Sequence, residues 1–465
     1  MKSKTWLALV LSMAVLFGLS VTAYASEGIE SHTVLNQYVQ HGIPTSVEDC
    51  INFDTTSLTQ EEYIKEVQNY KAKDNASEIE LICQVYLKVT KAAVRSSLYE
   101  TDFLIYNKMS KDKTILYRES ESRYLRELYK ELGWEILEDD ISFWNFKSTV
   151  DSGKTTAVAS IVEDYTYYIT DGFDDESFRR REYSFKLIKS VDGWRITEVR
   201  TNDVHEDSSF DYSPIDVEAR LECFISEKEQ IKAHPVIVDD MNKSSISAMQ
   251  KQTAQREYNY DWTYDVGEAV NYAKAHYQDT SHALFGYNST NNCQNFASQC
   301  VWAGLGGTNS ATARPAVSIN AGTVSASDFN VWCCNEASTY YDNWELNWAW
   351  TYVPSFANLM AVSTSSAEGP YGNSYFTYAV ANAEKGNVLY FNKQGTATLL
   401  GIDHAMFVTA VIGTAGSRTK DQVKIASHTT ATSSAYQVLS SYTDYPATNF
   451  ARSKIICGFY NVPQP

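Results

Sequence analysis

Apolar side chains in the first half of the chain recur first at helical and then at strand spacing. Steps of three and four residues from 77 to about 106 predict an amphipathic helix, and a second, more polar helix is expected over 119–132. Strand patterns follow at 155–165, 166–170 and 182–199. The last of these contains Asp192-Gly193, a dipeptide typical of a hairpin turn. The first half is therefore expected to form an α+β module.

An amphipathic helix that begins at Cys293 is the clearest pattern in the second half. Four capping-type residues at 289–292 precede it, and Gly304, Gly306 and Gly307 mark its end. Polar side chains occupy most of the other face. The apolar face is expected to consist of Cys293, Phe296, Ala297, Cys300, Val301 and Gly304.

Two strands are predicted downstream, at 402–411 and 422–428, with a polar turn between them. If that turn centres near Gly416, His404 on the first strand lies directly across from His428 on the second, to within a slip of about two residues. A helix at 265–277 and a short buried strand at 388–391 complete the pattern. We expect helices packed on an antiparallel sheet.

Cys293 is the candidate nucleophile. A helix N-terminus offers unpaired N–H groups and a partial positive charge, which stabilise a thiolate and lower the pKa of a cysteine. The alternative is a buried structural cysteine, an interpretation that fits Cys300 well because Cys300 lies mid-helix, deep on the apolar face.

Two histidines could complete a catalytic set with Cys293. His404 is the candidate general base and His428 the candidate residue that orients it, since nucleophile, base and orienter form the general layout of cysteine hydrolases. Either histidine alone could equally be a structural residue. Asp403 is a further candidate, but as the strand neighbour of His404 it is expected to point to the opposite face.

The segment from about Tyr258 to Tyr460 resembles the "putative amidase domain" of secreted bacterial proteins, which is similar to papain-like cell-wall amidases and peptidases. The family usually has acidic residues where this chain has Asn292 and Asn387. The matching positions are Ala269, Tyr272, Ala273, Asn292 to Cys300, Ala303-Gly304, Trp350-Thr351, Gly386 to Val388, His404 and Ser427 to Thr429.

This resemblance implies a papain-like α+β fold and a cysteine-dependent hydrolase that acts on peptidoglycan or another cell-wall amide, with no cofactor and no metal. One alternative is a cell-surface binding protein with a degenerate amidase domain, to which the loss of charge at Asn292 and Asn387 lends weight. Another is acyl transfer by the same site. The first half resembles cystatin-like or nuclear-transport-factor-like α+β modules in pattern alone, and it could be a binding pocket or a spacer.

The net charge and the N-terminal residues indicate which partners and which cellular location to expect. A net charge of −18 argues against a nucleic-acid partner. Residues 1–25 have the charged, apolar and small-residue parts of a signal peptide, so the mature chain is expected to start at Ser26, secreted and without a membrane anchor. The predicted domains are the signal at 1–25, the α+β module at 26–205, an acidic linker with a helix at 206–255, and the amidase domain at 256–465.

Eight cysteines in a secreted chain raise the question of disulfides and metal sites. Their spacings match no metal-site pattern. The sequence predicts neither a disulfide pairing nor an oligomeric state.

Overall fold

The computed structural model divides the chain into two compact units, which we describe separately. Unit 1 comprises residues 1–170 and 181–221, and unit 2 comprises 171–180 and 222–465. The structure describes residues 74–95, 112–191, 193–203, 206, 210–235, 262–279, 292–307, 332, 348–362, 369–391, 401–442 and 446–459.

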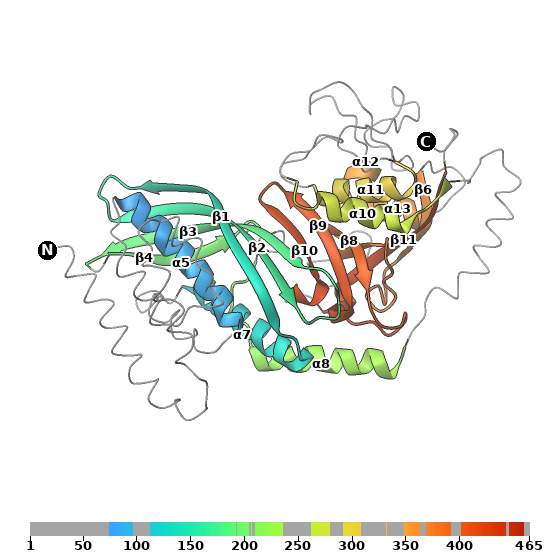
Figure 1. The fold of residues 1–465 in the computed structure, drawn as a ribbon, viewed down its shortest axis with the longest axis horizontal. Coiled ribbons are helices and arrows are strands. Elements are labelled where there is room, and N and C mark those ends of the chain that lie inside the picture. The colour runs from blue at the N-terminus through green and yellow to red at the C-terminus, as the bar shows by residue number, and fades with distance from the viewer. Residues whose placement is uncertain are drawn as a thin grey trace, which may run out of the picture. The chain divides into compact units, whose positions relative to one another are not determined.

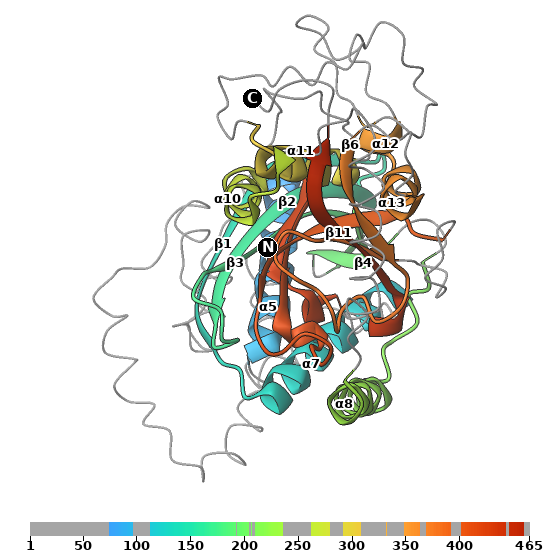
Figure 2. The ribbon, with the colours of Figure 1, turned by 90° about the vertical axis from the view of Figure 1, so that its right-hand side faces the viewer.

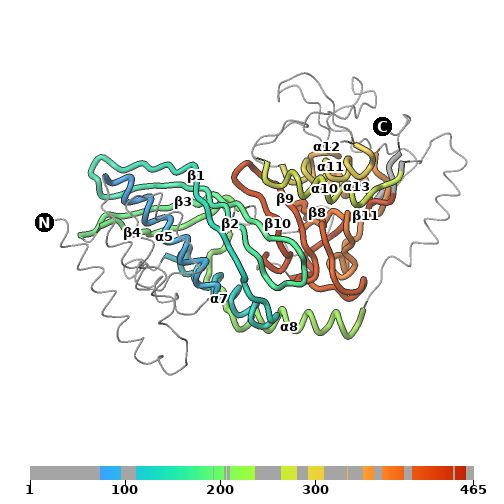
Figure 3. Tube along the Cα trace, viewed as in Figure 1, coloured from blue at the N-terminus to red at the C-terminus, as the bar shows by residue number. Residues whose placement is uncertain are grey.

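Unit 1 consists of two long helices and an antiparallel sheet. The helix α5 packs against the sheet through one apolar face, and its course along the strands is visible in Figure 3. The strand order is β1–β2–β3–β4. The elements are α5 (Asn75–Arg95), α7 (Lys113–Leu132), β1 (Ile136–Val150), β2 (Thr156–Ile169), β3 (Ser177–Ser190), of which residues 181–190 belong here, and β4 (Gly193–Thr201).

The strands of unit 1 differ from the predicted ones in two places. The predicted strands 155–165 and 166–170 form the single strand β2, and β1 was not predicted at all. Only Ile141 of β1 is buried, so the strand lacks the alternation of apolar and polar residues that identifies a half-buried strand. The predicted hairpin is confirmed, because Ser190 pairs with Gly193 at the turn between β3 and β4.

Unit 2 is built on a larger antiparallel sheet. Its order is β3 (residues 177–180)–β10–β9–β8–β7–β11–β5, and β6 pairs with residues 452–459 of β11. Its elements besides β3 are α8 (Val217–Ala233), of which residues 222–233 belong here, α10 (Val266–His276), α11 (Cys293–Gly304), α12 (Trp348–Thr351), α13 (Val353–Val362), β5 (Trp262–Thr263), β6 (Gly369–Tyr375), β7 (Val388–Phe391), β8 (His404–Val411), β9 (Val423–Thr430), β10 (Ser433–Val438) and β11 (Phe450–Phe459).

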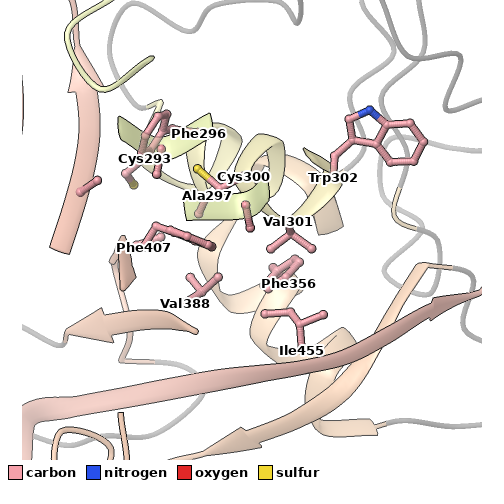
Figure 4. Close-up of a cluster of buried hydrophobic side chains, with 14 of the residues drawn as sticks. Cys293, Phe296, Ala297, Cys300, Val301, Trp302, Phe356, Val388, Phe407 and Ile455 are labelled. Carbon is pink, nitrogen blue, oxygen red and sulfur yellow. The ribbon is translucent and has the colours of Figure 1, made fainter. Parts of the chain in front are cut away.

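The helices α10 to α13 lie together on one face of this sheet, as Figures 1 and 2 show from two directions. The core between the two layers is close-packed and apolar. Phe296, Ala297 and Val301 of α11 meet Phe407 of β8 and Val388 of β7 there (Figure 4). The α+β class, with helices packed on an antiparallel sheet, is therefore confirmed.

The two compact units divide the chain differently from the predicted domains. Residues 171–180 fall inside the predicted N-terminal module, yet they belong to unit 2. The predicted helix of the linker is present as α8, and Lys228 on it forms an ion pair with Asp421 of unit 2 at 2.8 Å. The predicted signal at 1–25 lies outside the described residues. Within the described part of the chain, no helix is long and apolar enough to cross a membrane.

Gly304 ends α11 at a point of close approach. A Cβ atom added there would lie 2.3 Å from the ring of Tyr264 and 2.9 Å from the carbonyl oxygen of Asp265. The hydroxyl of Tyr264 donates to the carbonyl of Gly386 at 2.9 Å, which holds that ring in place.

We expect Gly304→Ala to lower the free energy of unfolding by about 1–3 kcal/mol, because the methyl group overpacks this contact. Urea unfolding followed by circular dichroism measures the change. Gly267→Ala is the control: in the exposed first turn of α10 the new methyl group meets only the Asp265 carboxylate, at 3.1 Å, and we expect a change within about 1 kcal/mol. Equal stability of Gly304→Ala and the wild type would contradict the close approach.

Candidate active site

Cys293 occupies the first turn of α11, as predicted, at the edge of the apolar core (Figure 4). Its side chain is 1% exposed. The sulfur accepts backbone N–H groups from Ala405 on β8, from Gln294 and from Cys293 itself. The thiol thus lies where the start of a helix meets the start of a strand.

The pKa of Cys293 differs from the prediction. Burial raises it to about 11, and the three backbone N–H groups offset only part of that rise. The nearby carboxylate of Asp403 raises it further. The predicted lowering of this pKa is wrong in the resting structure, because the cost of desolvating a thiolate exceeds the stabilisation by the helix end. Cys293 rests as a neutral thiol.

Asn292 precedes the cysteine at the N-cap position, but its side chain does not cap the helix. Its Oδ1 accepts a hydrogen bond from Nδ2 of Asn295 at 2.8 Å. Its Nδ2 lies 3.0 Å from Nδ1 of His428, and its backbone N–H donates to the carbonyl of Thr429 at 2.9 Å. Asn292 thus does not cap α11, and its hydrogen bonds connect the start of that helix to the end of β9.

His428 is 1% exposed, and both of its ring nitrogens have identified partners. Nε2 lies against the carbonyl oxygen of Asp279, which can only accept, so Nε2 carries the proton. Nδ1 then accepts from the amide of Asn292. Burial lowers the pKa of His428 to about 4, although the hydrogen bond to Asp279 works in the other direction. His428 is therefore a neutral imidazole with a fixed tautomer.

The register of β8 on β9 is one residue away from the predicted register. Phe407 pairs with Ala426 and Val408 with Ile425. Continued along the strands, this register sets His428 opposite Ala405. The shift of one residue lies within the predicted slip of about two, but His404 and His428 are not directly opposite each other. A slip of one residue reverses the faces: His428 shares the helix-covered face with Ala426, as its ring contact with Phe296 also shows.

His404 begins β8 and is 2% exposed. It pairs with Phe391 on β7, and the two rings lie 4.9 Å apart between centroids. Strand alternation therefore directs His404 to the face opposite that of Ala405. The same alternation places Asp403 on the side of Ala405, in agreement with its effect on Cys293.

Cys293 belongs to the apolar core between α11 and the sheet, and the backbone N–H of Ala405 on β8 interacts with its sulfur. The pairing of β8 with β9 begins only at Phe407 and Ala426, further along the strands. His404 and His428 lie on opposite faces of the sheet, with His428 on the face covered by α11.

Asn387 replaces the second acidic residue of the family pattern. It is 3% exposed, and its Oδ1 accepts from Nη1 of Arg452 and from the backbone N–H of Glu384, both at 3.1 Å. Arg452 is fully buried and lies over the ring of Tyr375 at 4.2 Å. The side-chain amide of Asn387 thus stabilises the turn before β7 and binds the buried guanidinium of Arg452. These contacts give Asn387 a structural role.

Sequence reasoning missed two groups that support the site. The carbonyl of Asp279 fixes the tautomer of His428, and a backbone atom leaves no signal in a sequence. Trp350 donates from Nε1 to Oδ1 of Asn295 at 2.7 Å, which orients the amide that in turn bonds Asn292. Trp350 stands in the family pattern, but nothing in its position indicates this partner. Among the described residues, no group of three or more His, Cys, Asp or Glu side chains could hold a metal ion.

The low pKa of His428 predicts a loss of stability in acid. The folded pKa of about 4 lies below the ordinary value of 6.5, so the contribution is fully present above pH 6.5 and is lost as the pH falls toward 4. We expect about 3 kcal/mol less stability at pH 4 than at pH 7 from this group. His428→Gln removes the titration, so a smaller acid-induced loss in the variant supports the assignment. The charged groups that act on this ring are Asp279 and Arg180.

Comparison with known proteins finds a matching family for the second half of the chain. Residues 263–452 match the family model described as "Putative amidase domain". No curated protein matches. Two solved structures are similar in part: the intermembrane space region of chloroplast protein ARC6 (14% identity, 28% of this chain and 98% of that chain, TM-score 0.21) and the Kfla4162 protein from Kribbella flavida (13%, 28%, 91%, 0.21). At these TM-scores neither likeness carries an argument. The similarity to the family of the "Putative amidase domain" thus covers residues 263–452, which is less than half of the chain.

Proposed function

We propose that unit 2 hydrolyses an amide bond with Cys293 as the nucleophile. The observation that carries this proposal is the position of the Cys293 sulfur, at a helix start, with three backbone N–H groups directed at it. The family match supplies the class of bond. Backbone N–H groups directed at the sulfur also stabilise negative charge on a substrate oxygen placed beside it.

The resting thiol is neutral, so its proton has to leave as the sulfur attacks. His404 takes that proton while the sulfur forms a bond to the substrate carbonyl carbon. The carbonyl oxygen becomes an oxyanion, which the N–H groups at the start of α11 hold. The protonated histidine then gives its proton to the leaving nitrogen, the C–N bond breaks, and an acyl thioester remains on Cys293. Water hydrolyses the thioester, with the histidine again as base.

His428 serves this mechanism as a positioning residue. At neutral pH a group with a pKa of about 4 is a weak base, and its Nδ1 already accepts from Asn292. The ring instead fixes Asn292, and through the backbone it fixes Cys293. His404 remains as the candidate base because it directly precedes Ala405, whose N–H contacts the sulfur.

The proposed substrate is a peptide amide of peptidoglycan or another wall-linked amide, and the proposed location is outside the cell. The signal-like segment at 1–25 and the family resemblance support both. Acyl transfer would proceed through the same thioester, with an amine in place of water.

A second candidate function is a surface protein that binds a wall component without cleaving it. Two observations favour it: the pKa of Cys293 is about 11, and its side chain is 1% exposed. A site in this state has to open and to lose a proton before it reacts.

One experiment separates these functions. The mature protein is incubated with purified cell walls, and new amino groups and the soluble products are measured. Hydrolysis produces new amino groups, transfer produces a product only when an acceptor amine is added, and binding leaves the protein in the wall pellet without new amino groups. The last result would overturn the hydrolase proposal.

A further inference from the structure

A segment from the first half of the sequence is built into unit 2. Residues 171–180 belong to that unit, and Phe178, Arg179 and Arg180 at the start of β3 pair with Tyr436, Ala435 and Ser434 of β10. The segment thus extends the sheet that carries His404 and His428.

Buried charges fix this segment. Lys424 of β9 is fully buried, and its Nζ lies 2.7 Å from Oδ1 of Asp175, 2.8 Å from the carbonyl of Asp175 and 2.9 Å from that of Glu176. Lys274 of α10 bonds the other carboxylate oxygen at 2.6 Å. Partial burial opposes the charge of Asp175, but these hydrogen bonds outweigh it and lower the pKa of the carboxyl to about 2.

Arg180 is the last residue of this segment, and it is 7% exposed. Its side chain contacts the turn after α10. Its Nη1 donates to the carbonyl of Gln278 at 2.8 Å. The guanidinium lies 5.5 Å from the ring of Phe178, which in turn packs edge-on against Tyr277 at 5.4 Å. Arg180 and Phe178 therefore both contact the turn at residues 277–278.

Asp279, the next residue of that turn, contacts the candidate site through its backbone carbonyl. The carbonyl of Asp279 accepts from Nε2 of His428, and Nδ1 of His428 accepts from Asn292, the residue before Cys293. The charge of Arg180 also acts directly on His428 and lowers its pKa. A continuous set of contacts thus runs from Arg180 to the nucleophile.

We propose that Arg180 is a positioning residue of the active site. It holds the turn at 277–279 in the place where Asp279 fixes the tautomer of His428. The inference rests on the proposed function for its effect on activity, whereas its effect on His428 is independent of any activity. It also implies that unit 2 needs residues 171–180, which lie outside the part matched by the family model.

The test compares Arg180→Met with Arg180→Lys in the full-length chain, and Arg179→Met is the matched control from the next position of β3. We expect R180M to lower kcat by about 10- to 100-fold through misplacement of the site, with KM changed less than about threefold. We expect the pKa of His428, followed by NMR of its ring, to rise because a nearby positive charge is lost. Lysine keeps the charge, so R180K is expected to retain the low pKa and part of the activity.

Three outcomes decide the proposal. Activity and a His428 pKa equal to those of R179M would overturn it. A drop in melting temperature with an unchanged His428 pKa would assign Arg180 a structural role alone and would also overturn it. If R180M does not fold, R180K decides: wild-type kcat contradicts the proposal, and a reduced kcat with a low His428 pKa supports it. If the wild type cleaves no amide, the ring titration and the rate of Cys293 alkylation still test the contacts.

Discussion

Replacing Cys293 by alanine will abolish amide hydrolysis, with a loss of more than about 10³-fold in kcat and little change in stability. The covalent step requires the sulfur, which alanine lacks. The release of amino groups from purified cell walls measures the loss. Binding to the walls should persist in the variant, because alanine leaves the shape of the site almost unchanged.

Cys300→Ala is the matched control for this variant. Cys300 lies two turns along the same helix, fully buried in the core, where it is a structural residue. We expect a modest loss of stability and full activity per folded molecule. Equal activity of the Cys293 variant and this control would remove Cys293 from the chemistry and favour the binding function.

The raised pKa of Cys293 adds a pH dependence to the same experiment. With a pKa of about 11, the thiolate fraction at pH 7 is small and grows about tenfold with each pH unit. The rate of alkylation by iodoacetamide should therefore still be rising at pH 10. A plateau below pH 8 would indicate a thiolate that some group stabilises beyond the contacts seen in the resting structure.

Replacing His404 by alanine will lower kcat by about 10²- to 10⁴-fold, the usual worth of a general base. The loss should be largest near neutral pH and smaller in alkaline solution, where hydroxide removes the thiol proton without help. The pH profile of kcat/KM of the wild type and the variant measures both effects. His404→Gln tests the same point with a side chain that keeps the volume of the ring more closely.

His428→Gln is the comparison that assigns the two histidines. As a positioning residue His428 should contribute less, so its variant is expected to retain about 10- to 100-fold more activity than the His404 variant. The reverse order, with the larger loss in the His428 variant, would transfer the role of base to His428. That result would agree with its place on the helix-covered face of the sheet.

The sequence by itself determined the helix that carries the cysteine. Six apolar residues at helical spacing between Cys293 and Gly304 indicate the helix, and local periodicity is sufficient for that. The burial of its polar side chains as well, among them Gln294, Asn295 and Ser298, was decided by the tertiary structure. The hairpin of β3 and β4 and the helix α8 were predictable for the same reason, because each depends on neighbours in sequence. The strand β1, with one buried residue, carries no such pattern.

The tertiary structure alone decided how the site residues meet. The register of β8 on β9 depends on the turn and on a bulge near Ala410, and one residue of difference moves His428 from the face of His404 to that of Asn292. The pKa of Cys293 depends on burial by distant segments, which outweighs the local effect of the helix end. The contacts of Arg180 and Lys424 with segments about 100 and 250 residues away follow from side-chain geometry in the folded chain, and no local pattern encodes them.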